Sequence, residues 1–140
     1  MNYKLLLLAT LAAFIYLIVV NAALFPVFFP DGPPDRYENL RPAPLVQYHL
    51  LALLITAFLM AFLYQILFRG GPWWREGLKA GVVMALFVSV PMGLHAYAMI
   101  NTSFLVMMAP ALWVTVIWGI AGIVIGFVHR GTFRASEFKL

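Results

Sequence analysis

The sequence contains no cysteine, and charged residues make up only 10% of its 140 positions. Without cysteine the chain can have no disulfide bond, no thiolate metal ligand and no thiol nucleophile. A globular domain in water averages about a quarter charged residues, because its surface has to stay hydrated. Here 64% of the residues are hydrophobic, and five acidic and nine basic residues cannot cover a water-facing surface. The composition therefore excludes an ordinary soluble domain and predicts an integral membrane protein.

A second absence concerns the long apolar runs, which contain no Asp, Glu, Lys or Arg apart from Lys79 at the edge of the third. Ionisable residues at membrane depth usually mark proton relays, ion sites or counter-ions. Small multidrug exporters use an embedded carboxylate and quinone-linked disulfide oxidases use cysteines, so the sequence argues against both mechanisms. General acid–base catalysis needs a titratable group beside a second polar group in a pocket. We therefore expect no catalytic residues and a protein that is not an enzyme.

The apolar runs predict four membrane-spanning helices. The first run, Leu5 to Leu24, has twenty residues, and at ~1.5 Å rise per residue it spans ~30 Å, the thickness of a hydrocarbon core. The polar triplet Asn101-Thr102-Ser103 divides the longest uncharged stretch into two. Since lipid cannot hydrogen-bond the backbone, each segment should be a helix. The expected helices are at about 5–24, 45–68, 78–100 and 104–128.

The predicted fold is an all-α integral membrane protein, in which a single domain over residues 1–140 forms a four-transmembrane-helix antiparallel bundle. A proline-rich outer loop, 25–44, and an inner loop, 69–77, connect the helices. Lys4 followed by an apolar run also describes a signal peptide, with Val20-Asn21-Ala22 as a cleavage site, but the length of the run favours a retained helix.

The distribution of basic residues predicts the orientation. An N-terminus inside the cell leaves only two bases, Arg36 and Arg41, on the outer side. The inner side then holds seven, namely Lys4, Arg69, Arg75, Lys79, Arg130, Arg134 and Lys139. Such a bias is typical of cytoplasmic loops, so both termini should be cytoplasmic and the protein should be multi-pass in a bacterial inner (plasma) membrane. Bases beside apolar runs are a topology signal, and no nucleic-acid partner is expected.

Two histidines are the candidate cofactor ligands. His49 lies about one turn below the outer end of the second helix, and His95 lies between one and two turns below the outer end of the third. A short inner loop joins these helices, so the two imidazoles should lie at similar depth, as two axial ligands of haem b or two metal ligands would. A structural role, with a hydrogen bond to a neighbouring backbone group, is the alternative. His129, beside Arg130, is expected at the membrane interface.

Methionines near His95 suggest copper as another possible cofactor. His95 and Met99 share a helix face, and Met92, Met107 and Met108 lie in the outer halves of the third and fourth helices. Thioether and imidazole groups suit Cu(I). Methionine is also a common filler of irregular gaps, so packing is the alternative.

Small residues predict where helices approach closely. Gly119, Gly122 and Gly126 form a stripe on the fourth helix, which serves either packing within the bundle or docking of another subunit. In the third helix, Pro91 predicts a kink and Gly93 allows a close neighbour.

Three functional hypotheses follow from the sequence. The first is a non-catalytic accessory or assembly subunit that packs against a larger membrane complex or against itself. The second is a redox subunit in which His49 and His95 contact haem or quinone. The third is a small transporter or copper-handling protein that uses the cluster of Met and His residues, with the Pro91 kink as a gate.

Overall fold

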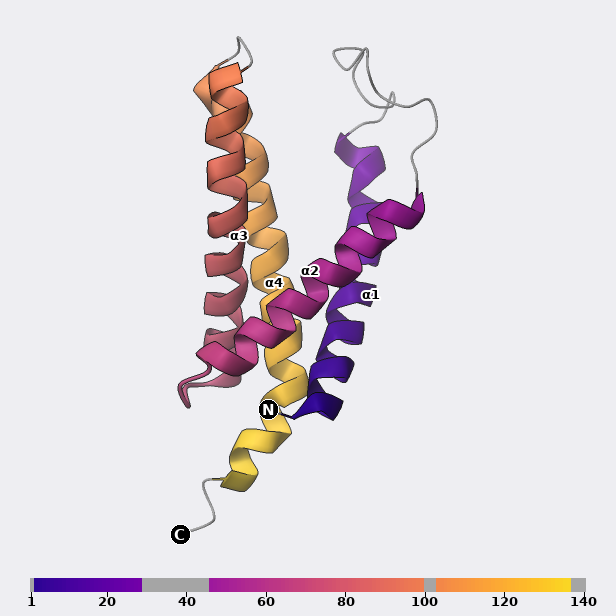
Figure 1. Ribbon diagram of the computed structural model, residues 1–140, viewed down its shortest axis with the longest axis vertical. Helices are drawn as coiled ribbons and strands as arrows, with labels where there is room; N and C mark the ends of the chain where they lie inside the picture. Colours follow the sequence, from indigo (N-terminus) through magenta and orange to yellow (C-terminus); the bar gives the residue numbers. More distant parts are fainter. Residues whose placement is uncertain (1, 29–45, 100–102, 137–140) are drawn as a thin grey trace.

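The computed structural model describes residues 2–28, 46–99 and 103–136, and these form four α-helices. The helices run alternately up and down, so that α1 begins and α4 ends at the same end of an antiparallel bundle (Figure 1). All four are long and apolar enough to cross a membrane, and the protein is therefore a multi-pass membrane protein in contact with the lipid bilayer. Their bounds are α1 Tyr3–Phe28, α2 Val46–Leu67, α3 Trp73–Met99 and α4 Phe104–Ser136.

Three of the helices extend beyond the segments that hydropathy predicts. α1 continues four residues into the predicted outer loop, α3 begins at Trp73 inside the predicted inner loop, and α4 continues past Arg130 to Ser136. Hydropathy marks where the lipid ends, whereas a helix can continue into the head-group layer and water because its hydrogen bonds are internal. The rest of the predicted loop 25–44, from residue 29 onward, lies outside the described residues.

Local hydrogen bonds define where the helices begin. The Asn2 side chain accepts a hydrogen bond from the Leu5 amide at 3.3 Å, and the Ser103 hydroxyl accepts one from the Val106 amide at 3.4 Å. Both residues therefore act as N-caps, supplying acceptors for amides that have no partner inside the helix. Pro72 precedes α3, and its carbonyl accepts from the Arg75 amide at 2.9 Å.

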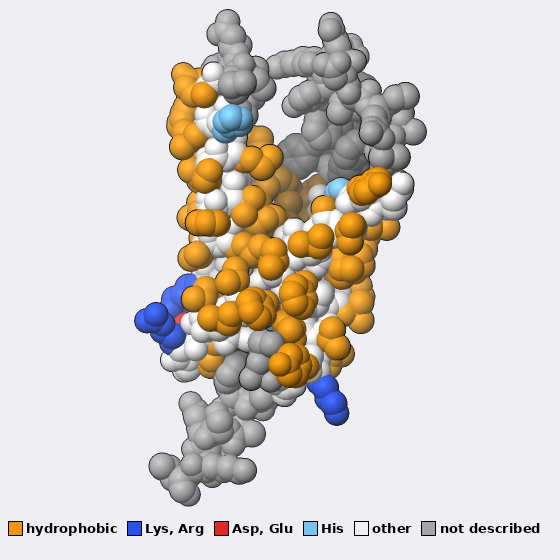
Figure 2. All heavy atoms as spheres, viewed as in Figure 1, with side chains coloured by type: hydrophobic (Ala, Val, Ile, Leu, Met, Phe, Trp, Pro, Cys, Tyr) orange, Lys and Arg blue, Asp and Glu red, His pale blue; other side chains and the backbone are white. Residues whose placement is uncertain are grey.

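Among the described residues, charged side chains gather at one end of the bundle (Figure 2), which we call the basic end and define by Lys4, Arg69, Arg75, Lys79 and Arg130. The opposite end is called the far end. Between them the helix surfaces are covered by hydrophobic side chains, many of them exposed, such as Phe87 at 81%. Since these side chains face lipid and not water, their exposure carries no hydrophobic cost.

The core lies in the half of the bundle nearer the basic end. Its residues recur every three or four positions, so that each helix contributes one narrow face. The buried set is Leu6, Ala9, Ala13 and Leu17 of α1, Ala57, Met60, Ala61 and Tyr64 of α2, Met84 and Ala85 of α3, and Ile117, Ala121 and Ile125 of α4. Many of these residues are small, which lets the helices approach closely.

The described residues of the far half form no comparable core. Among the described residues beyond those just given, the buried positions toward the far end are Gly93 and Ala111, one on each of α3 and α4. Figure 1 shows the reason: α3 and α4 stay side by side, whereas α1 and α2 diverge from them toward the far end. Figure 2 shows a hollow between the two helix pairs on the face in view. The described helices are therefore close together at the basic end and apart at the far end.

Backbone contact through glycines joins α3 to α4. A Cβ atom at Gly122 would overlap the backbone carbonyl of Gly77, and one at Gly81 would overlap the carbonyl of Trp118. Likewise, a Cβ at Gly126 would overlap the carbonyl of Trp73. Only glycine permits such an approach, which increases dispersion contacts where no hydrophobic effect drives helices together.

Candidate functional site

The far-end groove is an apolar depression between α1 and α2 at membrane depth, with a volume of about 420 Å³. It is lined by Ile18, Asn21, Ala22, Val46, His49, Leu50 and Leu53. Two of these side chains are polar, one from each helix. The Asn21 amide nitrogen donates to the Leu17 carbonyl at 2.8 Å, which leaves its side-chain oxygen as an acceptor. His49 is exposed and makes no hydrogen bond to any described residue.

His49 and His95 are not brought together. Each lies about one turn from the far end of its own helix. However, the far end of α2 lies over α1, apart from the far end of α3 (Figure 1). His95 is exposed on α3 and does not line the far-end groove. Counting residues gives a position along a helix, but depth and sideways separation both depend on how α2 tilts, which an all-apolar helix surface does not encode.

The candidate copper ligands are only partly described. Met92 is exposed on α3, and Met108 is half-buried on α4. The side chains of Met99 and Met107 lie outside those that the structure describes. Within residues 2–28, 46–99 and 103–136, no group of three or more His, Asp or Glu residues could hold a metal ion.

The predicted glycine stripe faces α3. Gly122 and Gly126 meet the α3 backbone, whereas a Cβ at Gly119 would meet only the side chains of Leu78, at 3.1 Å, and Val82, at 3.4 Å. The stripe therefore packs within this chain, against Gly77 and Gly81, two small residues of α3 that are not among the predicted contact positions. Their spacing of four residues was the available signal.

Pro91 does not interrupt the helix in which it lies. α3 continues through Pro91 as one helix to Met99 (Figure 1), with Pro91 exposed. Gly93 is buried. The ring of Pro91 is exposed on the surface of α3. Because proline has no backbone N–H, the carbonyl group four residues earlier in α3 lacks its usual helical hydrogen bond.

A buried polar network at the basic end was missed in the sequence. His129, which the sequence predicts at the membrane interface beside Arg130, is 2% exposed and is therefore buried among the helices at the basic end. Its Nδ1 lies 2.9 Å from the Ile125 carbonyl, and its Nε2 lies 3.0 Å from the Gln65 amide nitrogen. The carbonyl can only accept, so Nδ1 carries the proton and Nε2 accepts from Gln65. Gln65 also donates to the Asn2 carbonyl at 3.3 Å, which links α1, α2 and α4.

This network holds α1, α2 and α4 together at the basic end. The Tyr64 ring lies 4.9 Å from the His129 ring, with an angle of 45° between the planes, and covers it from the α2 side. With both imidazole nitrogens used by hydrogen bonds, His129 has no lone pair to offer a metal.

Comparison of the chain with protein-family models, curated proteins and solved structures finds no match.

Proposed function

We propose that this protein is a non-catalytic accessory subunit that packs against a transmembrane helix of another membrane protein. The observation that carries the proposal is the lack of a core among the described residues of the far half. A helix bundle that serves only itself gains from closing along its whole length, because close helix packing is what stabilises it in lipid. Here α1 and α2 separate from α3 and α4 over the half of the bundle that contains the far-end groove, which itself lies between α1 and α2.

The chemistry of the far-end groove defines the partner. Five of its seven lining residues are apolar, so the occupant must be apolar too. At membrane depth a protein occupant must also satisfy its own backbone hydrogen bonds, which a helix does. His49 adds one donor and one acceptor, and the Asn21 oxygen adds a second acceptor. The partner is therefore an apolar helix with a polar side chain near its end, and a second copy of this chain is the alternative.

Filling the groove tests this proposal. Ala22 lines the groove, and the adjacent Ala23 does not, although both are exposed. With a photo-crosslinking amino acid at Leu50, the protein in its native membrane should give one discrete adduct above its own mass. Ala22→Trp should abolish this adduct and Ala23→Trp should leave it. An adduct that persists in Ala22→Trp, or a single free chain after purification in mild detergent, would remove the proposal.

We further propose that the basic end faces the cytoplasm, with both termini inside, and that the membrane is the plasma membrane. The support is the excess of bases at this end, since translocation disfavours Lys and Arg near membrane spans. The proposal assigns the far-end groove to the outer half of the bilayer.

The redox and copper hypotheses have weaker support. A haem held by His49 and His95 would require the far ends of α2 and α3 to approach each other. An absorption spectrum of the protein purified after haem-supplemented expression tests this directly. A Soret band that disappears in both His49→Ala and His95→Ala would favour the haem hypothesis over the accessory role. Metal analysis of the purified wild type and of His95→Ala tests the copper hypothesis. Copper that is bound by wild type and lost in His95→Ala would favour it.

A further inference from the structure

The hydrogen bonds that join His129, Gln65 and Asn2 at the basic end allow only one protonation state. The Asn2 carbonyl can only accept, so the Gln65 amide has to present its NH₂ group to it, at 3.3 Å. The same NH₂ group lies 3.0 Å from His129 Nε2, which therefore carries no proton. Nδ1 carries the proton and donates to the Ile125 carbonyl at 2.9 Å. These three residues, which we call the latch, thus require a neutral imidazole.

A proton on Nε2 would break the latch on one side or the other. Both nitrogens of an imidazolium donate, so the NH₂ group of Gln65 would then face a second donor. If the amide turned round, its Oε1 could accept from Nε2, but the same oxygen would then face the Asn2 carbonyl, and two acceptors repel each other. His129 is 2% exposed, so an unsatisfied nitrogen there is unfavourable. The two contacts of Gln65 cannot both survive protonation.

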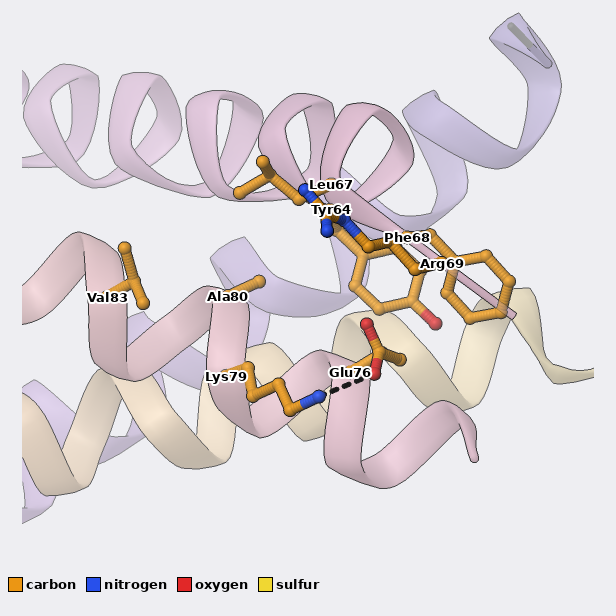
Figure 3. A pocket seen from close by; sticks show the side chains of 8 residues that line it. All are labelled: Tyr64, Leu67, Phe68, Arg69, Glu76, Lys79, Ala80 and Val83. Carbon is orange, nitrogen blue, oxygen red and sulfur yellow. Dashed lines mark hydrogen bonds and ion pairs between the residues drawn. The ribbon is translucent and has the colours of Figure 1, made fainter. Parts of the chain in front are cut away.

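The groups of α2 and α3 near the imidazole supply no free negative charge. Tyr64 of α2 lies against His129, with 4.9 Å between the ring centroids, and is a neutral phenol near pH 7. The Tyr64 hydroxyl lies on the side of Glu76 of α3, where both residues line a cavity of about 250 Å³ (Figure 3). The Glu76 carboxylate is paired with Lys79 at 2.9 Å. This carboxylate is therefore already neutralised.

The charged groups of α1 and α4 at this end are basic. Tyr3 and Lys4 are exposed in the first turn of α1. Arg130 of α4 lies over the phenylalanine ring three residues before it, with 3.7 Å from its guanidinium carbon to the ring centroid. The other bases of the basic end are Arg69, Arg75 and Lys79. Glu76 is the only acidic residue among those that the structure describes, so no second carboxylate of that set is present to stabilise a protonated His129.

The latch acts on the start of α1. The Asn2 carbonyl also accepts from the Leu6 amide at 2.9 Å, and the Asn2 side chain accepts from the Leu5 amide, so Asn2 is part of the first helical turn. Gln65 and His129 fasten this turn to α2 and α4. Gln65 is half-buried and Asn2 is exposed, which gives protons a route to the latch from the basic end.

We propose that uptake of a proton by His129 opens the latch and releases the first turn of α1 from α2 and α4. The protein then responds to acidification of the compartment that the basic end faces. The far-end groove lies at the opposite end of the bundle, so this inference does not rest on the proposed accessory role.

Unfolding of the purified full chain in mixed micelles with increasing SDS, at pH 7.5 and at pH 5.5, tests the proposal. A proton that binds only when the latch is open, with the ordinary imidazole pKa of about 6.5, lowers the equilibrium constant for folding about tenfold between these two pH values. Wild type should show this loss, and His129→Leu should not. The matched controls are His49→Gln and His95→Gln, which keep the latch and should lose stability as wild type does.

Gln65→Glu gives a second variant in case His129→Leu does not fold. A carboxylate at this position accepts from a protonated Nε2 and holds α2 to α4 when the imidazole is charged. Gln65→Glu should therefore keep its stability between pH 7.5 and pH 5.5. A tenfold loss in this variant, equal to that of wild type, would overturn the proposal.

A spin label reports directly on the first turn of α1. The chain contains no cysteine, so a nitroxide can be attached at Tyr3→Cys, which is 68% exposed in the wild type, or at Val19→Cys in the same helix, which is 59% exposed. The label at position 3 should become more mobile at pH 5.5, and the label at position 19 should not. With His129→Leu, neither label should respond. Mobility and stability of wild type that do not change with pH, or a response that persists in His129→Leu, would overturn the proposal.

Discussion

At the scale of single residues, glycines and one histidine determine how closely the helices approach. The glycine stripe on α4 contains two kinds of position. Gly122 faces the backbone of Gly77, whereas Gly119 faces the ends of the Leu78 and Val82 side chains. A backbone carbonyl can move only with its helix, but a side chain can change rotamer. Neighbouring glycines of the same stripe should therefore differ in how they tolerate a methyl group.

We expect Gly122→Ala to destabilise the bundle by about 1–3 kcal/mol, because α3 and α4 would have to separate. Gly119→Ala should cost well under ~1 kcal/mol, because the ends of the Leu78 and Val82 side chains can move aside for the added methyl group. Unfolding in mixed micelles with increasing SDS, followed by circular dichroism, measures both. Equal destabilisation by the two substitutions would show that backbone contact is not what distinguishes them.

His129 and Gln65 should behave as a coupled pair. His129→Leu removes the acceptor of the Gln65 amide, and Gln65→Leu removes the donor to His129 Nε2. Gln65→Leu leaves the buried Nε2 of His129 without its donor, and His129→Leu takes one acceptor from the part-buried Gln65 amide, at an expected cost of about 1–3 kcal/mol each. The double variant should cost less than the sum of the two, since both partners are then apolar. The same unfolding assay measures this, and strict additivity would contradict the assigned hydrogen bond.

At the scale of elements, the number and approximate position of the helices could be predicted from the sequence, because hydropathy averages over a whole segment. The helix ends could not, since Asn2, Pro72 and Ser103 start helices through local hydrogen bonds. The lateral arrangement of the helices could not be predicted from the sequence either. Apolar residues cover every face of α2, so no pattern indicates which face meets α3.

The same limit applies to the candidate sites: the sequence identifies residues of the right type but does not indicate which of them lie together. His49 and His95 were selected because the type of residue is rare in a membrane, yet the structure separates them. The network of Gln65 and His129 joins positions 64 residues apart. Such a contact requires knowing which helix ends meet, which only tertiary packing determines.

The connector between α2 and α3 makes a further prediction. Gly70 has a φ of 85°, a conformation that residues with a Cβ rarely adopt, and nothing lies within 4 Å of a Cβ built there. Gly70→Ala should therefore destabilise the bundle by about 1–2 kcal/mol through backbone strain alone. Gly70→Asn should cost less, because Asn tolerates this region. Matching stabilities of the two variants in the SDS titration would argue against strain as the cause.

At the scale of the whole molecule, an even number of crossings places the start of α1 and the end of α4 on one side of the membrane. The chain contains no cysteine, so a single introduced cysteine reports one position without background. Lys79, 69% exposed in its side chain, lies at the basic end, and Ser103 lies at the far end.

We expect Ser103→Cys to react in intact cells with a thiol reagent that cannot cross membranes. Lys79→Cys should react only after the membrane is permeabilised, because positive residues are retained inside. Labelling of Lys79→Cys in intact cells, with Ser103→Cys protected, would reverse the proposed orientation and move the far-end groove to the cytoplasmic half of the bilayer.

The divergence of the two helix pairs also has a mechanical consequence. A bundle that is narrow at one end and broad at the other displaces unequal areas in the two leaflets. Its energy in the bilayer then depends on curvature, because bending a membrane expands one leaflet and compresses the other. A wedge of this shape should be enriched where the leaflet holding the far end is stretched, and its distribution between highly curved and nearly flat vesicles would reveal this preference.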